Sequence, residues 1–442
     1  MPILQALKTN PFACLKSIYL ILRFLSGTGI VFLINKKNMT KKKYKIASLF
    51  SGCGGLDLGF AGGFSFLGKD YKRLNTKIVF ANDFDDDACN CYNANPLLID
   101  DGARCLLEDI RNVDAKQIPD FDIMLAGFPC QPFSNAGSRK GVNDANGRGT
   151  LFEECERIIR AKADANKRPK AFLFENVRGI LSSKMPDGKT TVPQEIQNRM
   201  EALGYDVSIK LVCSSDYGVP QQRYRVLIIG IDKQLKLIPF DFDSLLKVVQ
   251  KNNIPSTLTG KDEELLLGRI LQGVHEQKDD VVWEYSITTQ KNVELIGGCK
   301  HGQKAMDLFH EGYSKEELPS IVFEGRSWKD IPYEKLSPRF KKIADDPKKY
   351  HAPKFFRRFA FGEINGTITA SAQPENCGIT HPIENRRYSV RECARIQSFP
   401  DDFRFNAIPL QSQYKVIGNA VPPIMAWVVA TALLNHLQVK KK

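Results

Sequence analysis

The sequence predicts an α/β protein built around a mostly parallel sheet with helices on both faces. Between residues 45 and about 230, short apolar runs alternate with segments of helical periodicity. This alternation is typical of βαβ units, whose crossover helices cover both faces of a sheet. Hydrophobic residues make up 43% of the 442 residues and charged residues 26%, so the chain has the composition of a globular protein with a buried core.

Five apolar runs are the predicted strands, because each is short and lies between turn-forming or helical segments. They are Lys45–Phe50, Lys77–Ala81, Asp122–Ala126, Ala171–Phe174 and Arg225–Ile229. Between the third and fourth runs, apolar side chains recur at the spacing of one helix face, at Leu151, Cys155, Ile158 and Ile159. Two further helices are expected near the C-terminus, at Val390–Gln397 and Ala426–Leu437.

The changes in periodicity divide the chain into four segments. Residues 44–230, which hold the five apolar runs, are expected to form a first, α/β domain. Residues 231–385 are irregular, rich in Pro, Gly and charge, and are expected to form a smaller second domain without helical or strand periodicity. Periodicity returns in residues 386–438, which we expect to rejoin the first domain. Residues 1–38 are interpreted as an extension, with Met39 as a hypothetical alternative start.

The extension raises the question of a membrane span, since residues 11–34 are strongly apolar. Lys16 and Arg23 interrupt this run, and no small-residue cleavage site precedes Lys36 and Lys37. We therefore expect no membrane segment and no secretory signal. The eleven cysteines show no regular framework, which indicates reduced thiols in a cytoplasmic protein. No metal site is expected, because no further ligands follow Cys89 and Cys91 at metal-binding spacing.

The net charge of +13, from 63 Lys+Arg against 50 Asp+Glu, favours a polyanionic partner. Residues 231–385 are nearly neutral, with 22 basic and 23 acidic residues, but residues 335–358 hold nine basic and two acidic residues. Aromatic side chains interrupt this basic stretch, at Phe340, Tyr350, Phe355 and Phe356. Two interpretations stay open: a nucleic-acid contact, with phosphates on the cations and bases or sugars on the rings, or a solvated charged face.

Candidate catalytic groups follow directly after the predicted strands. Cys130 lies between two prolines in the segment 127–134 (GFPCQPFS), just after the third run, and Glu175 ends the fourth. Because carboxyl ends of parallel strands share one edge of a sheet, we expect this thiol and carboxyl group to lie close together. Arg223 and Arg225 enter the last strand and would favour the thiolate form of the cysteine. A buried structural thiol is the alternative for Cys130.

The glycine-rich loop 50–57 (FSGCGGLD) follows the first strand and opens a helix, which is compatible with NAD, FAD or S-adenosylmethionine. Asp83 lies after the second strand, where an acid commonly binds ribose hydroxyls, and Phe84 beside it could stack on an adenine. The alternatives are that Asp83 caps the next helix and that Phe84 belongs to the core.

Taken in order, these elements resemble the cytosine-5 DNA methyltransferase family of bacterial restriction–modification type. The resemblance runs from about Lys45 to about Ala430. The matching motifs are FSGCGGLDLGF (50–60), GFPCQPFS (127–134), ENV (175–177), QQRYR (221–225), RRYSVRECARIQSFPDDF (386–403) and QYKVIGNAVPP (413–423). The irregular residues 231–385 fall where this family has its target recognition domain.

The resemblance implies a reaction and a set of residues. Cys130 would attack carbon 6 of a cytosine flipped out of duplex DNA, Glu175 would bind ring nitrogen 3 and the amine, and Arg223 and Arg225 would stabilise negative charge. The implied cofactor is S-adenosylmethionine, bound by Phe50, Gly52, Gly54, Asp83, Phe84, Asp109, Ile110, Leu151 and Asn419. The implied substrate-binding residues are Pro129, Gln131, Ser134, Asn176 and Gln221.

Asp83 and Phe84 depart from the family, in which glutamate and an indole or aliphatic side chain are more frequent at these positions. The implied partners are double-stranded DNA and, functionally, a cognate restriction endonuclease, with the enzyme acting as a monomer in the bacterial cytoplasm. Two rival functions are a transfer-RNA cytosine methyltransferase on the same fold and a non-catalytic DNA-binding protein. The intact Cys130, Glu175 and arginines argue against the latter.

Overall fold

The computed structural model describes residues 42–100, 102–128, 151–276, 280–346 and 355–439. Residues Lys43–Lys442 form one compact unit. The apolar residues 11–34 and Met39 lie outside the described residues, and so does most of the predicted catalytic loop, with Pro129, Cys130, Gln131 and Ser134.

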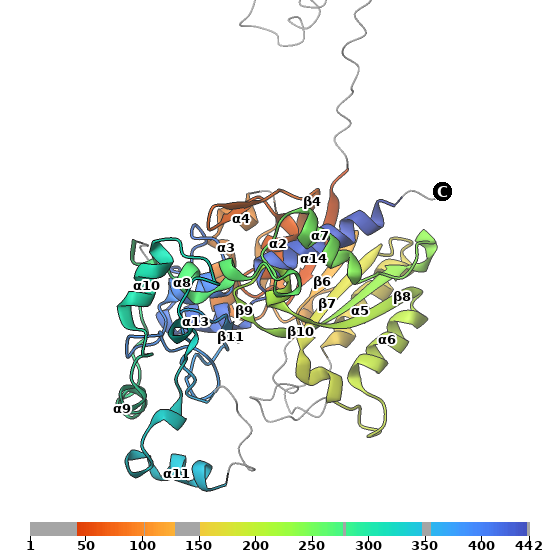
Figure 1. The fold of residues 1–442 in the computed structure, drawn as a ribbon. Coiled ribbons are helices and arrows are strands. Elements are labelled where there is room, and N and C mark those ends of the chain that lie inside the picture. The colour runs from red at the N-terminus through yellow and green to blue at the C-terminus, as the bar shows by residue number, and fades with distance from the viewer. Residues whose placement is uncertain (1–41, 101, 129–150, 277–279, 347–354, 440–442) are drawn as a thin grey trace, which may run out of the picture. The chain divides into compact units, whose positions relative to one another are not determined.

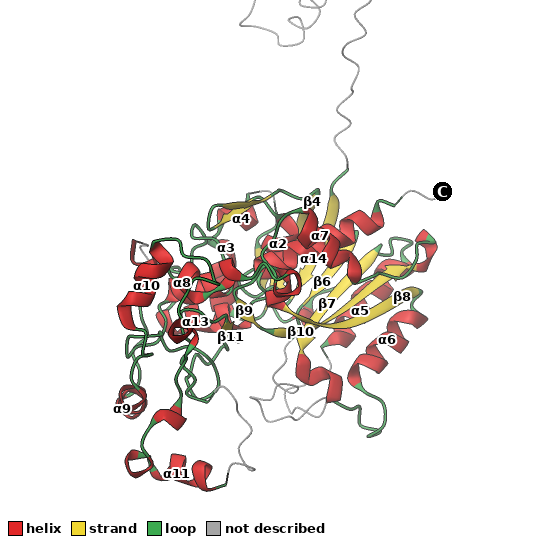
Figure 2. Cartoon of the chain, viewed as in Figure 1, coloured by secondary structure: helices red, strands yellow, loops and turns green. Residues whose placement is uncertain are grey.

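A seven-stranded sheet is the centre of the compact unit (Figures 1 and 2). All five predicted strands are confirmed, and two more lie at the edges of the sheet. The order is β5 (Cys105–Leu107), β4 (Thr76–Asp83), β1 (Tyr44–Leu49), β6 (Ile123–Ala126), β7 (Ala171–Val177), β10 (Tyr224–Asp232) and β8 (Tyr205–Cys213). Neighbours from β5 to β7 pair in parallel, and β10 is antiparallel to both β7 and β8. The predicted mostly parallel sheet is therefore confirmed.

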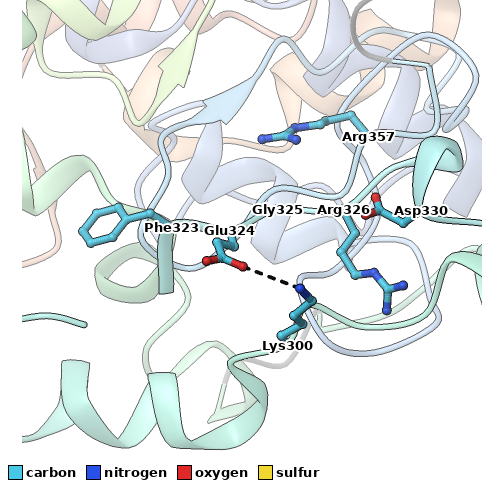
Figure 3. Close-up of a pocket in the computed structure, with 7 residues that line it drawn as sticks. All are labelled: Lys300, Phe323, Glu324, Gly325, Arg326, Asp330 and Arg357. Carbon is cyan, nitrogen blue, oxygen red and sulfur yellow. Dashed lines mark ion pairs between the residues drawn. The ribbon is translucent and has the colours of Figure 1, made fainter. Parts of the chain in front are cut away.

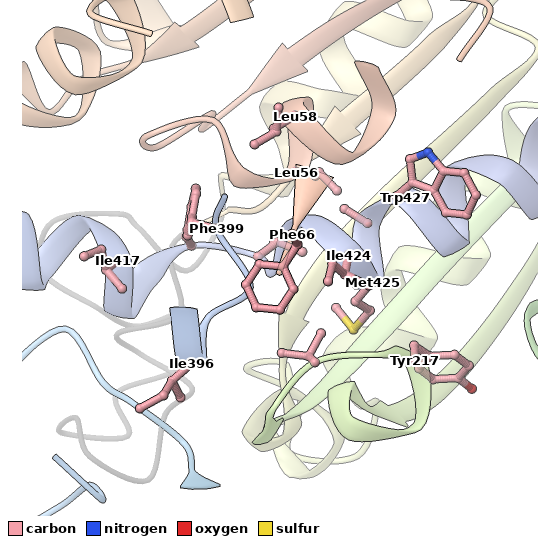
Figure 4. Close-up of a cluster of buried hydrophobic side chains, with 14 of the residues drawn as sticks. Leu56, Leu58, Phe66, Tyr217, Ile396, Phe399, Ile417, Ile424, Met425 and Trp427 are labelled. Carbon is pink, nitrogen blue, oxygen red and sulfur yellow. The ribbon is translucent and has the colours of Figure 1, made fainter. Parts of the chain in front are cut away.

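Side chains alternate along each strand, so one strand contributes to two separate cores. In β7, Leu173 belongs to a core shared with α2 (Gly55–Ala61) and α14 (Pro423–Leu437), as Figure 4 illustrates for helix residues such as Leu56 and Trp427. Phe172 and Phe174 belong to the other core, shared with α5 (Phe152–Asp164) and α6 (Val192–Ala202). Helices thus cover both faces of the sheet, as predicted.

The remaining elements outside residues 231–385 are short. Two helices, α3 (Asp86–Asn93) and α4 (Pro96–Ile99), follow β4, and β2 (Phe64–Phe66) pairs with β3 (Lys69–Tyr71). The motifs near the C-terminus form α12 (Val390–Ile396) and α13 (Leu410–Asn419), and the former begins in a capping box between Ser389 and Glu392. Leu410–Leu437 is apolar and long enough to cross a membrane, but 89% of its most apolar window is buried within the protein, as in a core helix.

Residues 231–385 contain more helix than their weak periodicity predicted. The helices are α7 (Asp243–Lys251), α8 (Leu267–Ile270), α9 (Ile287–Ile296), α10 (Gly302–His310) and α11 (Pro338–Asp345). Most are two or three turns long, so each buries only a few apolar side chains, and a window of 11–18 residues misses them. One short strand, β11 (Asn365–Gly366), pairs with β9 (Gln221–Gln222), which precedes this segment.

A small third core lies within this segment, and it contains aromatic residues of the basic stretch 335–358. Phe340 on α11 packs with Phe355 and Phe356, and all three side chains are at most 3% exposed. The interpretation that these rings stack on bases or sugars is therefore wrong, because they hold the lobe together. Tyr350 lies outside the described residues.

Candidate active site

Three predicted site residues and Gly127, which opens the segment 127–134, form a row across the sheet, because each directly follows one of four strand residues in register. Asn82 of β4 pairs with Leu49 of β1, Leu49 with Ala126 of β6, and Ala126 with Phe174 of β7. The residues that come next are, in the same order, Asp83, Phe50, Gly127 and Glu175. At a strand spacing of about 4.8 Å, this row spans about 14 Å from the predicted cofactor acid to the predicted catalytic acid.

The glycine-rich loop after β1 has a backbone that few side chains tolerate. Phe50 and Gly52 have φ angles of 55° and 56°, and Gly54, which caps α2, has a φ angle of 90°. A Cβ on Gly54 would lie 2.4 Å from the Leu98 side chain, whereas a Cβ on Gly52 would meet no atom of the described residues within 4 Å. Side chains therefore pack against the loop at Gly54, whereas the space beside Gly52 is open and leaves room for a ligand at the carboxyl end of β1.

Asp83 is joined to this loop by hydrogen bonds. The backbone N–H of Gly52 donates to Asp83 Oδ2 at 2.8 Å, and that of Asp85 donates to Oδ1 at 3.0 Å. Burial raises the pKa of Asp83, and these backbone donors oppose that rise. Asp85, not Asp83, caps α3, since its side chain accepts from Ala88 N–H. The capping alternative for Asp83 is therefore excluded.

Phe84 is 61% exposed, which excludes the alternative that it is a core residue. A large exposed ring beside an acid at the strand end is suited to stacking on a planar ligand. It directly follows Asp83, whose carboxylate accepts a hydrogen bond from Gly52 N–H. The aromatic surface and the acid are therefore neighbours, as the sequence predicted.

The other predicted cofactor residues divide into two kinds. Ile110 and Leu151 are buried in the core beneath the loop, at 3% and 8% exposure. Asp109 is a half-buried carboxylate, and the hydrogen bonds that it accepts from Arg111 lower its pKa. Asn419 ends α13 and is exposed. Ile110 and Leu151 can contact a ligand only at its margin, whereas Asp109 and Asn419 have free surface to do so.

Glu175 lies beside Arg225 at the other end of the row. Arg225 Nε is 2.7 Å from Glu175 Oε1, and the two side chains are only 11% and 8% exposed. The N–H is not aligned with that oxygen, so Oε1 is buried without a hydrogen-bond donor from the described part of the chain. A Cβ on Gly127 would lie 3.8 Å from Glu175 Oε2. The carboxylate therefore stands next to the start of the loop that carries Cys130.

Arg223 does not join this pair, contrary to the expectation that both arginines act together. Its side chain is 1% exposed, and its guanidinium donates to the carbonyl oxygens of Ile368 and Gly418, both at 2.9 Å. The Ile368 carbonyl lies in the segment 231–385, and the Gly418 carbonyl lies in α13. Arg223 thus joins its own segment to those of Ile368 and Gly418, because a single guanidinium can donate to several buried acceptors at once.

Gln221 and Asn176 were expected to bind substrate, and both are fully buried. Gln221 donates to the side chain of Gln397 and accepts from Ile368 N–H at 3.0 Å. Asn176 Oδ1 accepts from Val177 N–H at 2.9 Å. The Gln221 amide is bonded inside the protein, which argues against a substrate contact for it, whereas the substrate contact of the buried Asn176 stays a prediction.

Sequence reasoning missed Gln397, which is central to this buried junction. Its amide donates to the carbonyls of Ile417 and Ala420 at 3.0 and 2.7 Å, beside its contact with Gln221. The available signal was its place inside the motif 386–403. Its full burial agrees with this role, because buried polar groups are nearly always hydrogen-bonded.

A cavity of about 330 Å³ lies within residues 231–385 (Figure 3). It is lined by Lys300, Phe323, Glu324, Gly325, Arg326, Asp330 and Arg357. Lys300 and Glu324 form a loose ion pair at 3.9 Å, and Arg357 is paired with Glu363 at 2.6 Å. The described lining includes none of the predicted catalytic or cofactor residues, so this cavity is separate from the row at the sheet edge.

The fold and the row of residues define a class of protein. An open parallel sheet with an open glycine-rich loop after its first strand, and an acid and an exposed ring after the next, is the Rossmann-like arrangement of S-adenosylmethionine-dependent methyltransferases. Residues 44–435 match the family model described as C-5 cytosine-specific DNA methylase. The chain belongs to this family, and it is a DNA cytosine-5-methyltransferase.

Individual relatives agree with this assignment. Type II methyltransferase M.FnuDI of Fusobacterium nucleatum is 31% identical over 398 residues, which cover 90% of this chain and 96% of that protein. Type II methyltransferase M.NgoPII of Neisseria gonorrhoeae is 30% identical, over 91% of this chain and 99% of that protein. Among solved structures, the Dnmt2 methyltransferase of S. pombe is similar in fold, with a TM-score of 0.51 at 14% identity, covering 90% of this chain and 100% of that one.

Proposed function

We propose that the protein transfers a methyl group from S-adenosylmethionine to carbon 5 of a cytosine flipped out of a short duplex DNA sequence, through a covalent Cys130 adduct. The observation that carries the proposal is the buried carboxylate of Glu175. Its Oε1 has no hydrogen-bond donor in the described part of the chain, while Arg225 lies 2.7 Å away. A buried oxygen in this state is costly unless a ligand completes its bonding.

The cofactor fits the other end of the row. The open space in front of Gly52, the acid of Asp83 and the exposed ring of Phe84 suit the methionine, ribose and adenine parts. Asp109 and Asn419 have exposed polar groups that could complete this site. S-adenosylmethionine supplies the methyl group that the cytosine receives.

The protein's own groups account for the remaining chemistry. The Cys130 thiolate adds to carbon 6, and Glu175 holds a proton at ring nitrogen 3, so that negative charge does not build up on the ring. Arg225 keeps positive charge beside Glu175 and near the carbonyl oxygen of the cytosine. After methylation, loss of the carbon-5 proton allows the bond between carbon 6 and Cys130 to break, which releases the product.

We assign DNA recognition to residues 231–385, and catalysis and cofactor binding to residues 44–230 with 386–438. The separate small core of the 231–385 segment supports this division. The type II names of the relatives support a role in a restriction–modification system, in which methylation protects host DNA from a cognate endonuclease. We infer that the enzyme acts as a monomer on DNA in the bacterial cytoplasm.

The test is bisulfite sequencing of plasmid DNA of random sequence after incubation with the protein and S-adenosylmethionine, with Cys130→Ala as the matched control. Protected cytosines confined to one short motif, and absent with the variant, are the expected result. Trapping with a duplex that contains 5-fluorocytosine should give a covalent adduct only with the wild type. Methylation of transfer RNA in place of duplex DNA, or no protection anywhere, would contradict the proposal.

A further inference from the structure

An exposed arginine and an exposed tyrosine lie together next to the Glu175–Arg225 pair. Arg225 of β10 pairs with Val177 of β7, so the next residues outward, Tyr224 and Arg178, are also neighbours. The Arg178 guanidinium carbon lies 5.8 Å from the centroid of the Tyr224 ring. This distance is within the range of a cation–π contact, which holds the guanidinium over the ring.

Both members of this pair face solvent. Tyr224 is 46% exposed although it belongs to a strand of the central sheet, and Arg178 is exposed at the start of the turn after β7. No ion pair joins Arg178 to a carboxylate in the described residues, in contrast to Arg225, which faces Glu175. Arg178 therefore presents an uncompensated positive charge on an ordered aromatic support.

The pair is close to the proposed cytosine pocket but on the other side of the strands. Side chains alternate along a strand, so Tyr224 points away from the face that carries Arg225 and Glu175. Arg178 follows Glu175 by three residues, which is at most about 10 Å of extended chain. Arg178 directly follows the last residue of β7, so a DNA backbone that crosses this carboxyl edge to present a base to Glu175 passes Arg178.

We propose that Arg178 and Tyr224 form a phosphate-binding site for the DNA strand that carries the target cytosine. This inference rests on the proposed function and adds a binding contact to it. A guanidinium binds phosphate through two parallel hydrogen bonds, and the ring of Tyr224 fixes its plane and packs against the adjoining sugar. The pair anchors the backbone while the base enters the pocket.

The experiment compares methylation kinetics of the wild type, Arg178→Ala and Tyr224→Ala on a duplex with the motif found by bisulfite sequencing. Measurements at several salt concentrations give the salt dependence of DNA binding. Arg178→Ala is expected to raise KM for DNA about tenfold, because it removes a charge-assisted contact, and to leave KM for S-adenosylmethionine unchanged. The slope of log Kd against log salt should fall by about 0.9, the value for one lost phosphate contact.

Tyr224→Ala should raise KM for DNA by a smaller factor, because the arginine charge remains. The matched control is Lys170→Ala, which removes a similar pair at the amino end of β7, where Lys170 Nζ lies 5.1 Å from the centroid of the Tyr44 ring. An unchanged salt slope in Arg178→Ala, or an equal change in the control, overturns the inference. A wild type that methylates no duplex overturns the proposed function itself, so the two failures are distinguishable.

Discussion

The ion pair between Glu175 and Arg225 allows a quantitative prediction about stability. The two groups approach to 2.7 Å with side chains 8% and 11% exposed. At an effective dielectric constant of about 20, their mutual attraction is about 6 kcal/mol, most of which offsets the cost of removing both charges from water. The net value of the pair is therefore small, but the cost of removing one partner alone is large.

The two single substitutions should differ in their cost. Arg225→Ala leaves a buried carboxylate without a cation, and we expect it to lower the free energy of unfolding by about 3–5 kcal/mol at pH 8. Glu175→Gln keeps an oxygen near Arg225, which still donates to the Tyr224 carbonyl at 2.7 Å, so we expect a loss of about 1–2 kcal/mol. The double variant should lose less than the sum, because the stranded carboxylate is gone.

Urea unfolding of the four proteins, followed by intrinsic fluorescence, measures these differences. Additive losses, or a greater loss for Glu175→Gln than for Arg225→Ala, would refute the reasoning.

Three further predictions follow from other parts of the site. Asp83→Ala removes the acceptor for Gly52 N–H and the proposed ribose ligand. Calorimetry should show that the affinity for S-adenosylmethionine falls by about tenfold or more, while the Kd for DNA is unchanged. An unaltered Kd for the cofactor would contradict the assignment. Arg223→Ala removes the donors to two carbonyl oxygens, and it should lower the free energy of unfolding in urea by about 2–4 kcal/mol. A loss below about 1 kcal/mol would argue that Arg223 does not join these segments. Burial raises the pKa of Asp57, whose carboxyl group accepts a hydrogen bond from the Ser48 hydroxyl, from 3.8 to about 6. The contribution of Asp57 to the free energy of unfolding is therefore greatest below about pH 4, and it falls by about 3 kcal/mol as the pH rises through 6. Asp57→Asn should remove this fall, and an unchanged pH profile of unfolding would show that the fall arises elsewhere.

Local pattern predicted much of the fold. The five central strands were found because each is a short apolar run that ends in a turn or a polar group. The edge strands β5 and β8 were missed, and both have exposed or half-buried side chains that weaken the apolar signal. The helices of residues 231–385 were missed for a related reason, since each buries only a few apolar residues. The apolar pattern of a sequence predicts a strand most clearly where that strand is buried on both faces.

By itself, the sequence determined the class of sheet, the order of the motifs and the edge at which they meet. Asp83, Gly127 and Glu175 fall on one row because residues after registered parallel strands must lie at the same edge. This follows from backbone hydrogen bonding alone.

Only the tertiary structure decided what each polar side chain does. Arg223 and Arg225 are two residues apart, yet one binds buried carbonyls from distant segments and the other faces Glu175. Phe340 lies in a basic stretch but belongs to a core, while Phe84 is exposed. These outcomes depend on groups that are far away in the chain, because the partner that satisfies a buried charge or covers a ring is set by packing and not by its sequence neighbours.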